Sequence, residues 1–268
     1  MAVIAEQTLS LLVDTGSANL WVIDATCVSR GCNGSHLGRY SRHKFNTTQS
    51  SSLSKENKTL TITYESGAWC QGEIVEDVVS IAGMTIGRQE FVAATGVDDI
   101  FIFEVFDGIL GLGWPALSVG NITTPMQNLL PTLDAPLFTI WMDRKAISDT
   151  GSLGLVVPSA VMDGIANQTG ATYDNIYHFY FVPCSTMMTQ PDLEFTINGI
   201  KFSVPSVEYV LNSDINPEQC ILSISEVHSG GFGTDWVLAD TWIRTFCNIY
   251  DVGQARIGFA TAIHPRIY

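Results

Sequence analysis

The sequence predicts an all-β fold of two similar lobes, with only a few short helices. Short apolar or alternating runs, separated by Gly, Asn, Asp and Ser, recur along the chain, which is typical of strands joined by turns. The tetrapeptide Asp-Thr-Gly-Ser also occurs twice, beginning at Asp14 and at Asp149, and each copy is followed by an apolar run. A repeated motif of this kind indicates two related structural units.

Strands are expected along most of the chain. In the first half they are expected at Leu9–Val13, Leu20–Ile23, Leu60–Tyr64, Ile74–Ile81 and Glu90–Ala93. In the second half, Leu193–Ile197 and Lys201–Val204 should form a hairpin, because Asn198-Gly199 between them supplies the positive φ angles of a type I′ turn. Further strands are expected at Trp236–Leu238, Asn248–Asp251 and Arg256–Ala260.

Helix signals are few. Thr124 followed by Pro125 and an apolar run predicts one short helix, and a second should begin after Pro158 and end near Gly170. Strands and helices do not alternate in the manner of a parallel α/β sheet. The sequence therefore favours a mostly β protein.

The two halves share an internal spacing. Leu20-Trp21-Val22 follows the first motif at the same offset at which Leu155-Val156-Val157 follows the second. Each half later carries an apolar pair and a small residue, Ile109-Leu110-Gly111 and Val237-Leu238-Ala239. We therefore expect an N-terminal lobe over residues 1–140 with the first motif, and a shorter C-terminal lobe over residues 141–268 with the second.

The composition restricts the partners. The 268 residues include 27 acidic and 13 basic side chains, for a formal net charge of −14, so nucleic acid and anionic membranes are not expected as partners. Such a surface suits an acidic environment, because protonation of its carboxylates reduces the repulsion between them. The five histidines show no metal-ligand spacing, and we expect neither a metal nor another cofactor.

The cysteines and sequons indicate the secretory pathway, with a secreted or lysosomal destination. Cys27 and Cys32 close a loop short enough for a local disulfide, and Cys184 and Cys220 bracket a strand-rich segment. A disulfide between the remaining Cys70 and Cys247 is also compatible with the sequence. Glycosylation sequons begin at Asn33, Asn46, Asn57, Asn121 and Asn167. Because Met1–Val13 has no signal-peptide character, we expect the natural N-terminus to lie further upstream.

The paired motifs suit acid–base chemistry. A single Asp-Thr-Gly-Ser is compatible with an ordinary turn, but two equivalent copies would bring Asp14 and Asp149 face to face if the lobes met about a two-fold axis. Two close carboxylates cannot both ionise cheaply, so one keeps its proton while the other stays anionic. The anion can accept a proton from a shared water, and the neutral acid can polarise a carbonyl group.

Together these features resemble the pepsin and cathepsin D family of two-lobed aspartic peptidases over nearly the whole chain. The matching stretches, besides the two motifs, are Asn19–Val22, the Cys27–Cys32 loop, Phe106–Gly113, Pro191-Asp192, Phe195–Gly199 and Ile257–Ala260. The resemblance implies a pepsin-like fold, and an endopeptidase that acts on polypeptides at acidic pH, binds pepstatin-type inhibitors and works as a monomer. It is also in this family that the proton sharing described above is known.

The resemblance also assigns roles to individual residues. It implies that Asp14 and Asp149 form the catalytic dyad, supported by Thr15, Gly16, Ser17, Thr150, Gly151 and Ser152. Tyr64, followed by Ser66 and Gly67, matches the tyrosine of the flap that covers the substrate, and Trp21 matches its hydrogen-bonding partner. Without the resemblance, Trp21 and Tyr64 would be interpreted as core residues of β-strands.

The chain also departs from the family. Asp14 and Asp149 are 135 positions apart, about fifty fewer than in the family layout, and a block of second-lobe strands should be missing between Lys145 and Ala146. Glu65 stands where the family has Gly after the flap Tyr, and Ala239 stands where it has Gly.

These departures leave alternatives open. The second hypothesis is a catalytically impaired, peptide-binding homologue, or an inactive splice or gene-model variant. A β module that binds carbohydrate or protein has only the strand content and the sequons in its favour.

Overall fold

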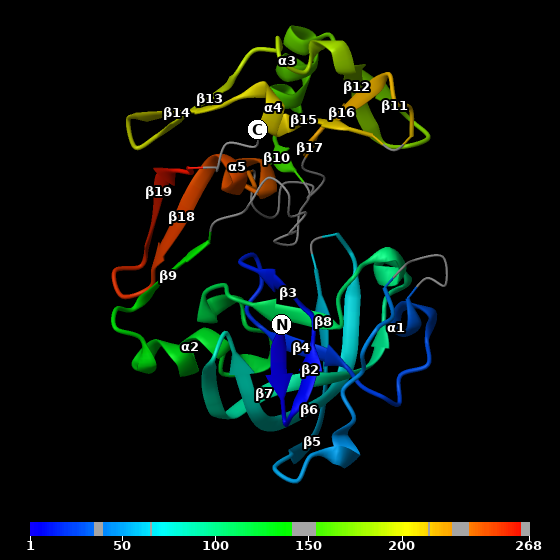
Figure 1. Cartoon of the computed structure of the whole chain (residues 1–268), viewed down its shortest axis with the longest axis vertical. Coiled ribbons are helices and arrows are strands. Elements are labelled where there is room, and N and C mark those ends of the chain that lie inside the picture. The colour runs from blue at the N-terminus through cyan, green and yellow to red at the C-terminus, as the bar shows by residue number, and fades with distance from the viewer. Residues whose placement is uncertain (35–39, 65, 141–153, 214, 227–235, 264–268) are drawn as a thin grey trace. The chain divides into compact units, whose positions relative to one another are not determined.

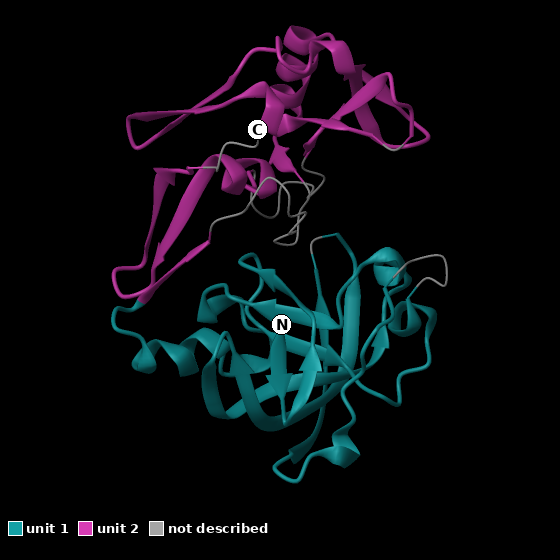
Figure 2. Cartoon of the chain, viewed as in Figure 1, with its two compact units in different colours: residues 1–136 teal, residues 137–268 magenta. Residues whose placement is uncertain are grey.

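The computed structural model describes residues 1–34, 40–64, 66–140, 154–213, 215–226 and 236–263 (Figure 1). The chain divides into two compact units, Met1–Pro136 and Leu137–Tyr268 (Figure 2). Strands dominate both units, and the helices are short, which confirms the all-β prediction. Each unit is described here by itself.

The first unit contains most of the long strands. They are β1 (Ala2–Ile4), β2 (Gln7–Leu9), β3 (Leu11–Asp14), β4 (Leu20–Ile23), β5 (Ser54–Thr63), β6 (Trp69–Ile81), β7 (Met84–Val97) and β8 (Gly108–Gly111). Its α-helices are α1 (Arg30–Asn33) and α2 (Pro125–Leu129), and its 3₁₀ helices are Thr47–Gln49, Asp99–Phe103, Pro115–Leu117, Val119–Asn121 and Leu130–Thr132. The short helix predicted after Thr124-Pro125 is α2, and Thr124 caps it in a capping box with Gln127.

These strands form an eight-stranded sheet in the order β2-β1-β6-β7-β4-β8-β3, with β5 paired to β6. The central strand β4 is buried along its whole length. Its alternate residues enter two different cores. Trp21 and Ile23 pack in one core, and Leu20 and Val22 pack in the other. This follows from the period of two in a strand, and it explains why the β4 sequence is a continuous apolar run.

Strand β8 lies against the segment 17–22 more closely than any side chain permits. A Cβ on Gly108 would lie 2.1 Å from the Trp21 carbonyl oxygen, and one on Gly111 would lie 2.5 Å from the Ala18 carbonyl carbon. Because both neighbours are backbone atoms, they cannot move aside as a flexible side chain would. The glycines of the Asp107–Gly113 stretch are therefore required by this contact.

The second unit is built from smaller sheets. Its strands are β9 (Leu137–Ile140), β10 (Leu155–Val157), β11 (Thr172–Asp174), β12 (Phe179–Pro183), β13 (Leu193–Ile197), β14 (Ile200–Val204), β15 (Val210–Asn212), β16 (Gln219–Leu222), β17 (Ile224–Glu226), β18 (Phe246–Asp251) and β19 (Arg256–Thr261). Its helices are α3 (Ser159–Thr169), α4 (Ser206–Tyr209), α5 (Asp240–Thr245) and a 3₁₀ helix at Cys184–Thr186. The sheets pair β10 with β17, β13 with β14, β11-β12-β16-β15 and β19-β18-β9.

Local signals placed several of these elements correctly. Asn198 and Gly199 both adopt positive φ between β13 and β14, and Gly170 ends α3 in the left-handed conformation. The strand expected at Trp236–Leu238 is reduced to an isolated bridge at Val237. Among the described residues, no helix is long and apolar enough to cross a membrane.

The topology around the first motif recurs in the second unit. Trp21, seven residues after Asp14, pairs antiparallel with Ile109, while β4 runs parallel to β7. Val156, seven residues after Asp149, pairs antiparallel with Val237, while β10 runs parallel to β17. The residues that carry the sequence repeat thus make equivalent strand pairings in the two units.

The β8 contact gives a prediction for stability. Gly111→Ala should lower the free energy of unfolding by about 2–4 kcal/mol, because the new methyl group forces two backbone segments apart. Gly87→Ala is the matched control, since nothing lies within 4 Å of its Cβ position and its φ is negative. Urea unfolding of both variants measures the difference, and equal midpoints would contradict the account of this contact.

Candidate active site

Asp14, the first predicted dyad member, is the last residue of β3. This strand runs parallel to β8 and pairs Asp14 with Gly111, and the Asp14 carbonyl accepts a hydrogen bond from Leu112 N at 2.7 Å. The side chain is buried, with 5% of its surface exposed. Asp14 is therefore held by a strand on one side and by the turn of its own motif on the other.

The carboxylate of Asp14 has a hydrogen-bond donor for each oxygen. Gly16 N donates to Oδ1 at 2.8 Å, and Ser17 Oγ donates to Oδ2 at 2.5 Å. Burial raises the pKa of Asp14 above its usual value, and these hydrogen bonds from Ser17 and Gly16 oppose the rise. A buried carboxyl with a raised pKa, aimed by two donors, is a strong candidate for a functional acid or base.

The predicted flap residues lie close to this carboxylate. The flap hairpin comprises residues 62–70, at the ends of β5 and β6, and Tyr64 stands at its turn. Tyr64 Oη accepts a hydrogen bond from Trp21 Nε1 at 2.7 Å and also contacts the hydroxyl of Ser17. Burial raises the pKa of Tyr64, so the phenol stays neutral. Trp21 and Tyr64 thus form one hydrogen-bonded pair, and Ser17 and Asp14 form a second pair next to it.

The turn of the flap hairpin is closed by backbone hydrogen bonds. Gly67, at φ +83°, donates to the Tyr64 carbonyl at 2.9 Å, and Tyr64 N donates to Ala68 O at 2.8 Å. Ser66 Oγ accepts from Ala68 N at 3.3 Å. Glu65, where the sequence departs from the family, lies outside the described residues.

Sequence reasoning missed the aromatic rings beneath Tyr64. Phe101 and Phe106 lie 5.6 Å apart between ring centroids, and each lies 6.1 Å from Trp21. Phe101 also lies 6.1 Å from Tyr64, edge to face. The Phe106-Asp107-Gly108 stretch was recognised as a family feature, but nothing local indicated that its ring packs on Trp21.

Asp149 and the rest of its motif, Thr150, Gly151 and Ser152, lie outside the described residues. The chain is described again from Gly154, where an added Cβ would lie 2.3 Å from the Ser223 carbonyl oxygen. Ala239, in place of the family glycine, is buried just before α5. Within the described residues, the support for the second half of the predicted dyad is the recurring strand topology.

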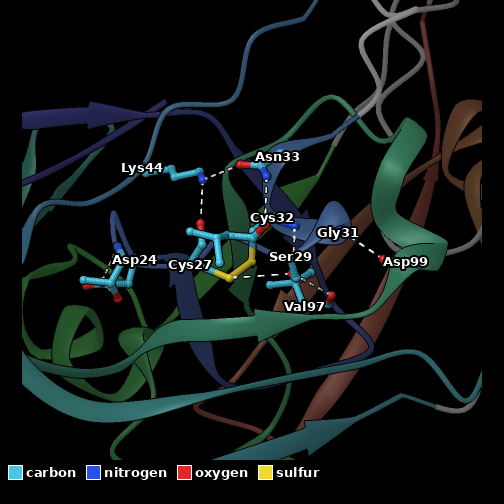
Figure 3. The surroundings of a disulfide bond; sticks show 11 residues. Asp24, Cys27, Ser29, Gly31, Cys32, Asn33, Lys44, Val97 and Asp99 are labelled. Atoms are coloured by element: carbon cyan, nitrogen blue, oxygen red, sulfur yellow. Dashed lines mark hydrogen bonds between the residues drawn. A yellow bond between two sulfur atoms is a disulfide. The ribbon is translucent and has the colours of Figure 1, made fainter.

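The first predicted disulfide joins Cys27 and Cys32 around α1 (Figure 3). Lys44 Nζ donates to the Cys27 carbonyl at 2.6 Å, and Gly31 N donates to Asp99 Oδ1 at 3.1 Å (Figure 3). The hydrogen bond from Gly31 to Asp99 attaches this cystine loop to the 3₁₀ helix Asp99–Phe103, which contains Phe101.

The second disulfide joins Cys184 and Cys220, so both bridges expected from the sequence are present. Cys70 and Cys247 are free thiols. Cys70 lies buried in the flap hairpin, and burial raises the pKa of its thiol to about 12.

Comparison with known proteins agrees with this geometry. The family model of the eukaryotic aspartyl proteases matches residues 4–148 and 143–262. The chain is 40% identical to Aspartic protease 1 and 42% identical to Aspartic protease 17, both of Caenorhabditis elegans, over 96% of its own length and 80% of theirs. It is 28% identical to human gastricsin over 96% of this chain and 78% of that protein.

The same comparisons show where this chain is shorter. The alignment with Aspartic protease 1 spans 316 residues, more than the 268 of the whole chain, so the relative has residues without a counterpart here. The two matches to the family model meet at residues 143–148, the region where the sequence spacing predicts a missing block. With matches to both halves, the chain belongs to the eukaryotic aspartyl protease family, with an incomplete second lobe.

Proposed function

We propose that this protein is an aspartic-type endopeptidase that hydrolyses polypeptides at acidic pH through a water activated by Asp14 and Asp149. The observation that carries the proposal is the Asp14 carboxylate, which is buried yet held by Gly16 N and Ser17 Oγ at 2.8 and 2.5 Å. Family membership supports proteolysis as the chemistry. Thr15, and Thr150, Gly151 and Ser152 of the second motif, complete the two proposed loops.

The proposed mechanism divides acid and base between the two carboxyl groups. One aspartate is ionised and removes a proton from the water, while its protonated partner donates a hydrogen bond to the scissile carbonyl. The raised pKa of Asp14 favours a shared proton under acidic conditions. Asp149 is proposed as the second carboxyl group of the pair because the strands after its motif repeat the pairings that follow Asp14.

The flap residues are proposed to bind substrate. In this proposal Tyr64, with Ser66 and Gly67, closes over an extended peptide, and Trp21 holds the Tyr64 hydroxyl by the 2.7 Å hydrogen bond. Bulky apolar side chains are the expected preference beside the scissile bond, since Phe101 and Phe106 make this region aromatic. We propose that pepstatin-type inhibitors occupy the same site and that the enzyme works as a monomer.

A second candidate function rests on the residues that the relatives have and this chain lacks. If that block is required to place Asp149, the protein binds peptides without cleaving them. Pepstatin binding and cooperative unfolding in the absence of turnover would identify this case. An inactive splice or gene-model variant would show neither property.

The catalytic proposal predicts the effect of removing one carboxylate. Asp14→Asn should lower the rate of pepstatin-sensitive cleavage of denatured protein at acidic pH by about a thousandfold, because Asn cannot act as a general base. Asp149→Asn should have a comparable effect. Asp134→Asn, at an exposed aspartate of the first unit, is the control and should leave the rate unchanged. Undiminished cleavage by the Asp14 variant would exclude this mechanism.

The pKa of Asp14 predicts a pH dependence of stability. Because the folded-state pKa is raised above the ordinary 3.8, Asp14 contributes stability at low pH that is lost as the pH rises through the folded-state value. Asp14→Asn removes this loss. The difference in melting temperature, variant minus wild type, should therefore be more positive at pH 7 than at pH 3. Thermal unfolding at both pH values measures it, with Asp134→Asn again as control. An equal or opposite difference would show that ionised Asp14 is not destabilising.

We also propose passage through the secretory pathway, to secretion or the lysosome, supported by the two disulfides. Of the sequon asparagines, Asn33, Asn57, Asn121 and Asn167 are exposed. Asn46 is half-buried, and its Oδ1 accepts a 2.7 Å hydrogen bond from Thr48, the hydroxyl residue of its own sequon.

This difference predicts uneven glycosylation. After expression in secretory cells, peptide mapping with and without peptide-N-glycosidase should find glycans at the exposed asparagines and the lowest occupancy at Asn46. Full occupancy at Asn46 would mean that the folded environment has no influence on its modification, and absence of glycans everywhere would contradict the secretory proposal.

A further inference from the structure

Arg42 holds the backbone of the segment 101–106, which carries Phe101 and Phe106. Its Nη1 donates to the Phe106 carbonyl at 2.6 Å, and its Nη2 donates to the carbonyls of Phe101 and, at 3.3 Å, Glu104. The guanidinium carbon also lies 5.2 Å from the centroid of the Phe106 ring, in cation–π geometry. One side chain thus ties together three carbonyl groups and one ring of a short loop.

The loop that carries Arg42 is itself anchored. His43 N donates to Asp107 Oδ1 at 2.7 Å, and Ser10 N donates to Asp107 Oδ2 at 2.8 Å. Phe45 N donates to the Ile23 carbonyl at 2.8 Å, at the end of β4. Because these bonds attach the loop to the central strands, the guanidinium is a fixed support.

The guanidinium has given up much of its water for these contacts. Arg42 is half-buried, and desolvation lowers its pKa, while the nearby charge of Asp107 opposes that change. The guanidinium stays charged, because arginine has too high a pKa to lose its proton in a protein. Three carbonyl oxygens around a desolvated cation form a stronger set of hydrogen bonds than neutral donors would give.

The segment that Arg42 holds supports Tyr64. Phe101 and Phe106 project from this segment onto Trp21, and Phe101 also contacts the Tyr64 ring. Tyr64 in turn hydrogen bonds to Trp21 and contacts Ser17, the donor to Asp14. A displacement of the 101–106 backbone would therefore remove the packing beneath the flap tyrosine.

We propose that Arg42 is a positioning residue for the flap: by fixing segment 101–106 it holds Phe101 and Phe106 under Tyr64, and so sets how well a peptide is bound. This inference rests on the proposed function, in which Tyr64 covers the substrate. Arg42 is assigned no contact with Asp14. Its loss should therefore weaken substrate binding more than it slows the chemical step.

Two variants of the full-length chain test the proposal. Arg42→Met keeps the apolar stem and removes all donors, whereas Arg42→Lys keeps the charge but not the fork that reaches several carbonyls at once. Arg88→Met is the matched control, because Arg88 is an exposed arginine of β7 whose partner is Glu76. Amide hydrogen exchange is measured on all of them over residues 99–106 and over the flap hairpin.

The expected results are graded. In Arg42→Met, exchange should become about tenfold faster in both segments, and KM for a peptide substrate should rise about fivefold with kcat changed less than about twofold. Arg42→Lys should give intermediate values, and Arg88→Met should match the wild type. If Arg42→Met does not fold, Arg42→Lys supplies the same comparison.

Distinct results would overturn the proposal. Unchanged exchange over residues 99–106 would show that Arg42 does not hold the segment. Faster exchange there with an unchanged flap hairpin, or a loss confined to kcat, would show that the segment does not position the flap. If the wild-type protein cleaves no substrate, the proposed function fails, yet exchange in the flap hairpin still decides whether Arg42 positions it.

Discussion

The first unit depends on the close contact between β8 and the segment 17–22. With glycine at 108 and 111, the two backbones approach to a distance at which a Cβ would overlap main-chain atoms. That approach lets β8 pair with β3 and with β4 at the same time, so the end of β3 and the middle of β4 lie on neighbouring strands. Asp14 and Trp21 take their positions from this arrangement.

The chemistry of the candidate site follows from two opposing effects on one carboxyl group. Burial disfavours the charged form of Asp14, and the hydrogen bonds from Gly16 and Ser17 favour it. The balance leaves a group that releases its proton less readily than an exposed aspartate. Fixing such a group in place reduces stability, which is a usual consequence of building a functional site.

The parts predicted from the sequence are those with local causes. The strand Leu20–Ile23, the Asn198-Gly199 hairpin and the helix after Thr124-Pro125 were correct because an apolar strand run, a positive-φ turn and a helix start are each indicated within a few residues. The pairing of Trp21 with Tyr64 came from resemblance, since no pattern in the sequence connects residues so far apart.

The remaining features of the site arise from long-range packing. In the sequence, Arg42 is one basic residue in a polar loop and Phe101 is one apolar residue among several. Their contact arises only because the fold brings segments 40–45 and 101–106 together. The same holds for Asp107, whose partners Ser10 and His43 lie in two other segments. Such contacts have no periodicity, so composition and spacing could not indicate them.

The buried thiol of Cys70 provides a way to observe the hairpin that carries Tyr64. While the hairpin is closed, it shields the Cys70 sulfur from solvent and keeps it in the unreactive thiol form. Whenever β5 and β6 separate, the thiol meets water, its acidity returns towards normal, and an alkylating reagent can trap it. The disulfide-bonded cysteines do not react, and peptide mapping separates Cys70 from the other free thiol, Cys247, so the rate of labelling at Cys70 would record how often this part of the molecule opens.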